Sequence, residues 1–79
     1  MKHHFYNLED IYNQEFKTVI LSGSHRNGEY RYNYQVFIVT ILTPEGPLVK
    51  FKLTGGDLFD DEYYDTLEAV FERFISIVD

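Results

Sequence analysis

Carboxylates gather in one stretch of the chain, residues 55–74, which reads GGDLFDDEYYDTLEAVFERF. This stretch holds seven of the thirteen acidic residues, and its only basic residue is Arg73. Clustered carboxylates can bind a cation, exchange protons in catalysis or attract a basic partner. Which of these the stretch can do depends on how the fold spaces its side chains.

Metal binding and catalysis are not predicted. The acidic stretch lacks the D-x-D-x-D-G order and closing glutamate of a calcium loop. His3, His4 and His25 would bind a metal only if the fold brought them together, so no metal or cofactor is expected. Ser22 and Ser24 lie beside His25 without an orienting acid or oxyanion donors, and there is no cysteine. We therefore expect a protein that is not an enzyme.

The composition favours one small acidic domain over residues 1–79. Seven Lys and Arg against thirteen Asp and Glu give a formal charge of −6. This charge opposes direct binding to nucleic acid or to an anionic membrane, and it favours a basic protein as partner. No apolar run has the length of a signal peptide or of a bilayer span, which predicts a cytoplasmic protein. Seven Phe and seven Tyr supply a compact core.

Hydrophobic periodicity predicts an α+β fold with the element order α-β-β-β-α. Asn7 has the side chain of an N-cap for a short first helix within residues 5–16. Asn27-Gly28 is typical of a two-residue hairpin, and the TPEGP sequence of residues 43–47 is typical of a turn. We expect a three-stranded antiparallel sheet with strands over residues 16–23, 30–42 and 48–53.

A long C-terminal helix is predicted from about Asp61 to Val78, with Asp60 as its N-cap. This helix would cover one face of the sheet. At about 100° per residue, its apolar side chains form one stripe that faces the core. The stripe contains Tyr63, Leu67, Val70, Phe74 and Ile77, and Phe71 and Val78 flank it.

Acidic side chains occupy the opposite face of this predicted helix, as a ridge about 16 Å long at 1.5 Å rise per residue. Neighbouring like charges cost about 0.2 to 0.5 kcal/mol per pair, so helix stability does not require the ridge. It is either a solvated face or a negative surface that stands in for phosphates against a basic groove. Its residues are Asp61, Asp65, Glu68 and Glu72, and Asp57 in the same stretch is a further partner-binding candidate.

Tyrosines on the second predicted strand are the other candidates for partner binding. Tyr30, Tyr32 and Tyr34 share one strand face because side chains alternate along a strand. They form either an exposed interaction surface or a layer packed beneath Phe5, Tyr6 and the first helix. An exposed aromatic sheet face would also suit a structural module that pairs with its own copy. The sequence is therefore compatible with a monomer and with a homodimer.

Two segments are similar to parts of small acidic phage anti-CRISPR proteins, which inhibit a CRISPR effector nuclease. The segments are TVILSGS, residues 18–24, and VFERFIS, residues 70–76. The resemblance implies a non-enzymatic inhibitor that occludes a basic DNA-reading groove with carboxylates, in the host cytoplasm if phage-encoded. The α-β-β-β-α order also describes the double-stranded-RNA-binding domain. In that domain the last helix begins with lysines, whereas residues 60–65 read DDEYYD here, which argues against RNA binding.

Overall fold

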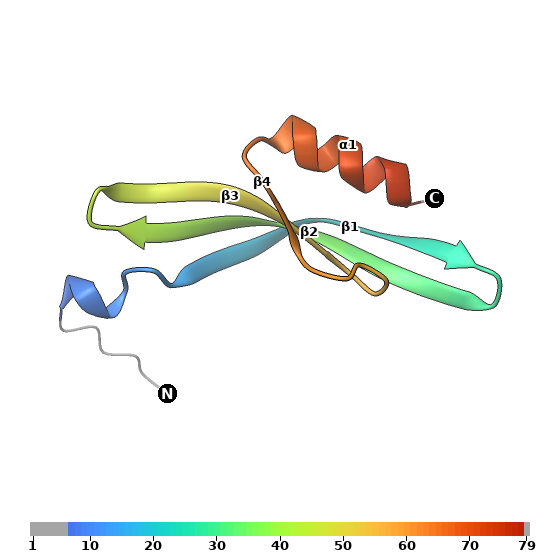
Figure 1. Cartoon of the computed structure of the whole chain (residues 1–79), viewed down its shortest axis with the longest axis horizontal. Helices are drawn as coiled ribbons and strands as arrows, with labels where there is room; N and C mark the ends of the chain where they lie inside the picture. Colours follow the sequence, from blue (N-terminus) through green and yellow to red (C-terminus); the bar gives the residue numbers. More distant parts are fainter. Residues whose placement is uncertain (1–6, 79) are drawn as a thin grey trace.

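The computed structural model describes residues 7–78 as a four-stranded antiparallel sheet with one α-helix on one of its faces (Figure 1). The strands lie in the order β1-β2-β3-β4. The predicted α+β class and the C-terminal helix are confirmed, but the sheet has one more strand than predicted. The elements are the 3₁₀-helix η1 (Leu8–Asp10), β1 (Glu15–Asn27), β2 (Tyr30–Thr43), β3 (Gly46–Gly55), β4 (Glu62–Tyr64) and α1 (Leu67–Ile77).

Two tight hairpins connect the three long strands near the predicted turns, but the first loop is Gly28-Glu29 and not the predicted Asn27-Gly28. Asn27 pairs with Tyr30, and between them Gly28 adopts a φ of 66°, which the first central position of a type II′ turn requires. Thr43 pairs with Gly46 in the second hairpin, and its hydroxyl donates to the Gly46 carbonyl at 2.6 Å. Both turns are therefore specified by residues close together in the sequence.

The predicted start of the C-terminal helix is wrong. Residues 62–64 form β4 instead, in which Tyr64 pairs with Phe51 of β3. Helix α1 begins after Thr66, whose hydroxyl accepts a hydrogen bond from the Ala69 N–H at 3.1 Å. Tyrosine favours strands, and the open edge of β3 offers these residues a backbone partner. Pairing with β3 therefore replaces the first predicted turns of helix.

The predicted first helix is also shorter than expected. Among the described residues of this segment, only Leu8–Asp10 form a helical turn, which begins after Asn7 as predicted. The Asn7 N–H donates to the Asp10 carboxylate at 3.3 Å. Asn13 then adopts a φ of 66° and donates its N–H to the Leu42 carbonyl at 2.8 Å. This bond directs the chain into β1 and ends the helical turn.

The core lies between α1 and the middle of the sheet. Val70 and Phe74 of α1 pack against three buried sheet side chains, those of Tyr34, Val36 and Leu53. Both long hairpins extend beyond the ends of α1, so the helix covers only part of its face (Figure 1). The fold therefore leaves apolar side chains partly exposed beside the helix.

Candidate partner-binding surface

The structure divides the predicted acidic ridge, so the prediction that its four carboxylates share one helix is wrong. Asp61 precedes β4, and Asp65 lies between β4 and α1. Asp65 forms an ion pair with Lys50 at 2.5 Å. Only Glu68 and Glu72 lie on α1, where both are exposed. The continuous ridge is thereby reduced to two carboxylates.

Asp61 takes part in a second ionic cluster, on the sheet face away from α1. There Lys52 is only 8% exposed and lies 3.5 Å from the Asp61 carboxylate and 3.4 Å from the Glu15 carboxylate. The Tyr63 hydroxyl donates to Glu15 at 3.1 Å. A buried lysine needs such partners, because an unpaired charge would be costly to bury. We infer that Asp61 has a structural role in compensating Lys52.

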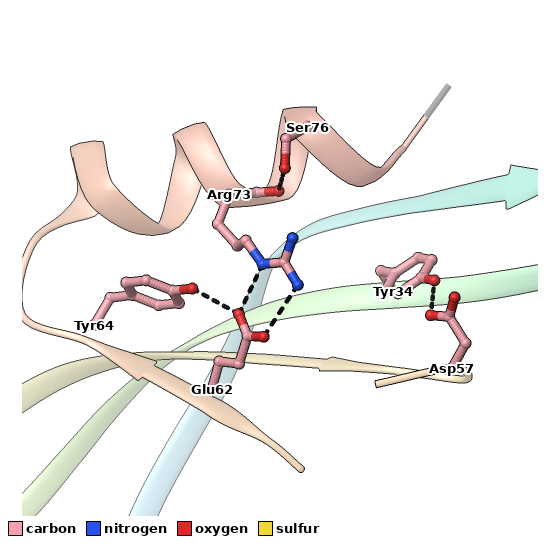
Figure 2. A network of polar contacts seen from close by, with 6 residues as sticks. All are labelled: Tyr34, Asp57, Glu62, Tyr64, Arg73 and Ser76. Atoms are coloured by element: carbon pink, nitrogen blue, oxygen red, sulfur yellow. Dashed lines mark hydrogen bonds and ion pairs between the residues drawn. The ribbon is translucent and has the colours of Figure 1, made fainter. Parts of the chain in front are cut away.

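Arg73, the single base of the acidic stretch, joins α1 to β4 (Figure 2). Its Nε and Nη2 donate to the two carboxylate oxygens of Glu62 at 3.0 and 3.2 Å. The Tyr64 hydroxyl also donates to Glu62, at 2.6 Å. The hydrogen bonds from Arg73 hold the pKa of Glu62 below its usual value. Because Arg73 serves this cluster, it does not neutralise the two glutamates of α1.

Replacing Glu62 with glutamine is expected to lower the free energy of unfolding at pH 7 by about 1 kcal/mol. The wild-type advantage should be fully present above pH 4.5, the ordinary pKa of glutamate, and should disappear as the pH falls through the lowered value. Urea unfolding from pH 3 to 7 measures this. Asp65→Asn is the control, with a loss under about 0.5 kcal/mol because Asp65 is exposed. Equal losses in both variants would contradict a structural role for the Glu62 cluster.

The three candidate tyrosines do not form one exposed surface. Tyr34 is buried in the core, and Tyr32 packs against that core. Tyr30 is 70% exposed at the tip of the first hairpin. Their proposed cover by the first helix is wrong, because η1 lies at the opposite end of the sheet (Figure 1). Phe5 and Tyr6, the other predicted cover, lie outside the described residues.

Asp57 also has a structural partner. Its carboxylate accepts a hydrogen bond from the Tyr34 hydroxyl (Figure 2). Burial, together with this hydrogen bond, raises the pKa of Tyr34 to about 12. The hydrogen bond from the Tyr34 hydroxyl to Asp57 links β2 to the loop after β3. This role of Asp57 does not depend on a partner, and partner binding by Asp57 stays a prediction.

The exposed side of α1 combines its two glutamates with an apolar stripe. The exposed fractions are 48% for Leu67, 45% for Phe71 and 52% for Ile75, which lie one turn apart. At about 100° per residue, Glu68 and Glu72 flank this stripe on its solvent side. Helical periodicity predicts that Leu67 faces the core, but α1 packs over β2, β3 and β4 and leaves this side uncovered. We call Leu67, Glu68, Phe71, Glu72 and Ile75 the α1 surface.

An open pocket adjoins the α1 surface where the helix faces β1. Its volume is about 490 Å³, and α1 contributes Leu67, Glu68 and Phe71 to its lining. Ile20 and Leu21 of β1 complete the lining. Glu68 is the single charged residue among these five. Sequence reasoning missed the pocket, because the two segments that line it are far apart in the chain.

Within residues 7–78, no group of three or more His, Asp or Glu side chains is placed to hold a metal ion. His3 and His4 lie outside that range. The one α-helix there lacks the length and the apolar character needed to cross a membrane. No protein-family model, curated protein sequence or solved structure matches the chain.

Proposed function

We propose that this chain is a non-enzymatic binding protein that recognises a basic partner protein through the α1 surface. One observation carries the proposal: Glu68 and Glu72 lie beside half-exposed apolar side chains, and neither pairs with a cation among residues 7–78. Within residues 7–78, the acidic residues of the stretch that form ion pairs are Asp61, Glu62 and Asp65. Neither glutamate of α1 forms one there. The α1 surface therefore combines charge available for steering with apolar area available for burial.

The two glutamates are separated by one helical turn, where like charges cost about 0.2 to 0.5 kcal/mol. A lysine or arginine from a partner would relieve this repulsion. The partly exposed Phe71 would gain burial in the same contact, at roughly 25 cal/mol per Å² of apolar area removed from water. Both effects favour the bound state over the free protein.

A nucleic-acid-handling protein is the partner class that we propose first. Such proteins carry grooves rich in Lys and Arg, which bind phosphates in their normal function. An acidic protein seated in such a groove would occlude it and act as an inhibitor. The resemblance to anti-CRISPR proteins suggests a CRISPR effector or another nuclease as the specific target. Two carboxylates with an apolar stripe support a mixed contact more than mimicry of a long phosphate row.

Charge reversal of the α1 surface tests the proposal. We expect the double variant Glu68→Lys, Glu72→Lys to abolish capture of basic proteins from a lysate at physiological salt. The attraction between the α1 surface and a basic partner would then become repulsion. The matched control is Glu29→Lys with Glu45→Lys, on the exposed turns of the two hairpins. Both double variants raise the formal charge by the same four units from −6. Quantitative mass spectrometry compares what each immobilised protein retains.

The control should retain the captured proteins, because its substitutions lie far from the α1 surface. Equal loss in both double variants would show that net charge alone governs capture. Undiminished capture by the α1 variant would remove its two glutamates from the binding site. Thermal unfolding should differ little between the variants, since all four glutamates are exposed.

A structural module that associates with its own copy is the second candidate, and exposed sheet residues favour it. Phe16 and Val49 are 43% and 48% exposed, and both pair with Thr40 of β2, which places them on one face. This end of the sheet lies beyond α1 (Figure 1). Light scattering over a range of concentrations distinguishes the candidates, since a strictly monomeric protein contradicts the module.

A further inference from the structure

We propose that the partner contributes an extended segment that adds to the free edge of β1 as a fifth strand. An apolar side chain of this segment fills the pocket beside α1, and an Arg or Lys two residues further along contacts Glu68. This inference rests on the proposed function and specifies the shape and chemistry of the segment that is bound. It follows from an open strand edge, an open apolar pocket and the charge at the rim of the pocket.

The open edge belongs to β1, which pairs only with β2 in the described sheet. Every second residue of such a strand directs its N–H and C=O groups away from its neighbour. Residues 15–24 of β1 contribute to this edge, on both sides of the pocket residues Ile20 and Leu21. Addition of a strand gives affinity through backbone hydrogen bonds and selectivity through alternate side chains.

The pocket lies where β1 and α1 diverge from each other. At Gly23 the two elements meet closely, because a Cβ there would lie 2.9 Å from the Phe74 ring and 3.0 Å from Val78. Toward the N-terminus of β1 they separate, and a bulge leaves Ile20 without a partner on β2 and 40% exposed. Ile20 and Leu21 of β1 thus line the pocket from the sheet side. A fifth strand would pair with the edge of β1 that faces away from β2.

The spacing of the chemical groups fits an extended segment. Side chains on one face of a strand repeat every second residue, about 6.6 to 6.8 Å apart. Phe71 and Glu68 are three residues apart on α1, where Cβ atoms are separated by about 5 to 6 Å. An apolar residue directed at Phe71 therefore has its next same-face neighbour close to Glu68. The recognised pattern is apolar-x-basic, in which x points to the opposite face of the sheet.

A second copy of this chain fits the site less well. It would bring another formal charge of −6 toward a surface that already carries the exposed carboxylates of Glu68 and Glu72. A basic amphipathic helix could contact Glu68 and Glu72, but it would leave the backbone groups of the β1 edge without partners. The free edge and the charge of the rim together favour a basic extended segment.

Two synthetic peptides of identical composition test the inference on the full chain. The first is Thr-Val-Thr-Phe-Thr-Arg-Thr-Val, and the second moves arginine next to phenylalanine, Thr-Val-Thr-Phe-Arg-Thr-Thr-Val. A shift by one residue transfers the arginine to the opposite face of a strand. We expect the first peptide to bind at least about tenfold more tightly, equivalent to about 1.4 kcal/mol. NMR titration should place its shift changes in residues 18–24 and 67–72.

Two further changes isolate the pocket and the edge. Ile20→Lys should reduce affinity for the first peptide at least about tenfold, because it puts a cation into the pocket. Methylation of alternate backbone nitrogens on the edge of the peptide that faces β1 should abolish binding, because it removes the N–H groups that would donate hydrogen bonds to β1. The Glu29→Lys and Glu45→Lys double variant should bind as the wild type does.

Equal affinities for the two peptides, no binding at millimolar concentration, or shift changes confined to other elements would overturn the inference. A dimer that Ile20→Lys dissociates would overturn it too, in favour of a second copy. The proposed function fails separately, if charge reversal at Glu68 and Glu72 leaves capture from the lysate intact. If that reversal abolishes capture while the two peptides bind equally, the proposed function stands and strand addition fails.

Discussion

Replacing Gly55 with alanine is expected to lower the free energy of unfolding by about 3 kcal/mol, near the upper end of the usual cost of overpacking. A Cβ at Gly55 would overlap Cδ1 and Cε1 of the Tyr34 ring and lie 2.9 Å from its Cγ. The ring cannot move aside easily, because Tyr34 is 1% exposed and its hydroxyl donates to Asp57. Strand pairing also fixes the two backbones, since Gly55 lies opposite Tyr34 in the β2–β3 register.

Gly56→Ala is the matched control for this steric effect. A Cβ at Gly56 would lie 3.2 Å from the Tyr32 ring, which is only partly buried, so a small shift relieves the contact. We expect Gly55→Ala to lower the Tm by more than about 10 °C, and Gly56→Ala by much less. Equal shifts at Gly55 and Gly56 would contradict this account.

Between pH 10 and pH 12 the protein is expected to lose on the order of 2 to 3 kcal/mol of stability as Tyr34 ionises. Burial is the largest cause that raises its pKa from 10.0 to about 12, and Asp57 adds to the effect. Because the pKa of Tyr34 is raised in the folded state, the stability that its neutral hydroxyl contributes is fully present below pH 10. It is lost as the pH rises through about 12, because the unfolded chain releases this proton more easily.

Urea unfolding at pH 8 to 12 measures the alkaline loss, and two tyrosine variants assign it. Tyr34→Phe should start from lower stability at pH 8, because its hydrogen bond to Asp57 is gone. It should then lose less stability above pH 10 than the wild type. Tyr30→Phe should follow the wild-type curve, since Tyr30 is 70% exposed. A Tyr34→Phe curve that falls as steeply as the wild type would assign the loss to other groups.

Local sequence signals predicted the parts of the fold in which neighbouring residues decide the conformation. Gly28 supplies the positive φ of the first turn, and both hairpins form where turn residues separate apolar runs. Helical periodicity also placed Val70 and Phe74 in the core. These features depend on backbone preference and on side chains within one or two turns of the chain.

Tertiary structure decided which acidic residues are free. The pairs Asp65 with Lys50 and Asp61 with Lys52 join positions that no local pattern relates. They arise because β4 pairs with β3, and this pairing also removed the first turns of the predicted helix. Glu68 was predicted as a partner-binding residue from the sequence, and the described part of the fold leaves it exposed and without an ion pair.

The sequence by itself determined an acidic α+β domain and the helical face that packs on the sheet. It could not determine the pocket at Ile20, which exists because α1 lies over β2, β3 and β4 and separates from β1 beyond Gly23. Nor could it show that Tyr34 is buried, which depends on Gly55 and on Asp57 far along the chain. Local preference acts over a few residues, whereas burial and charge pairing depend on which distant segments the sheet brings together.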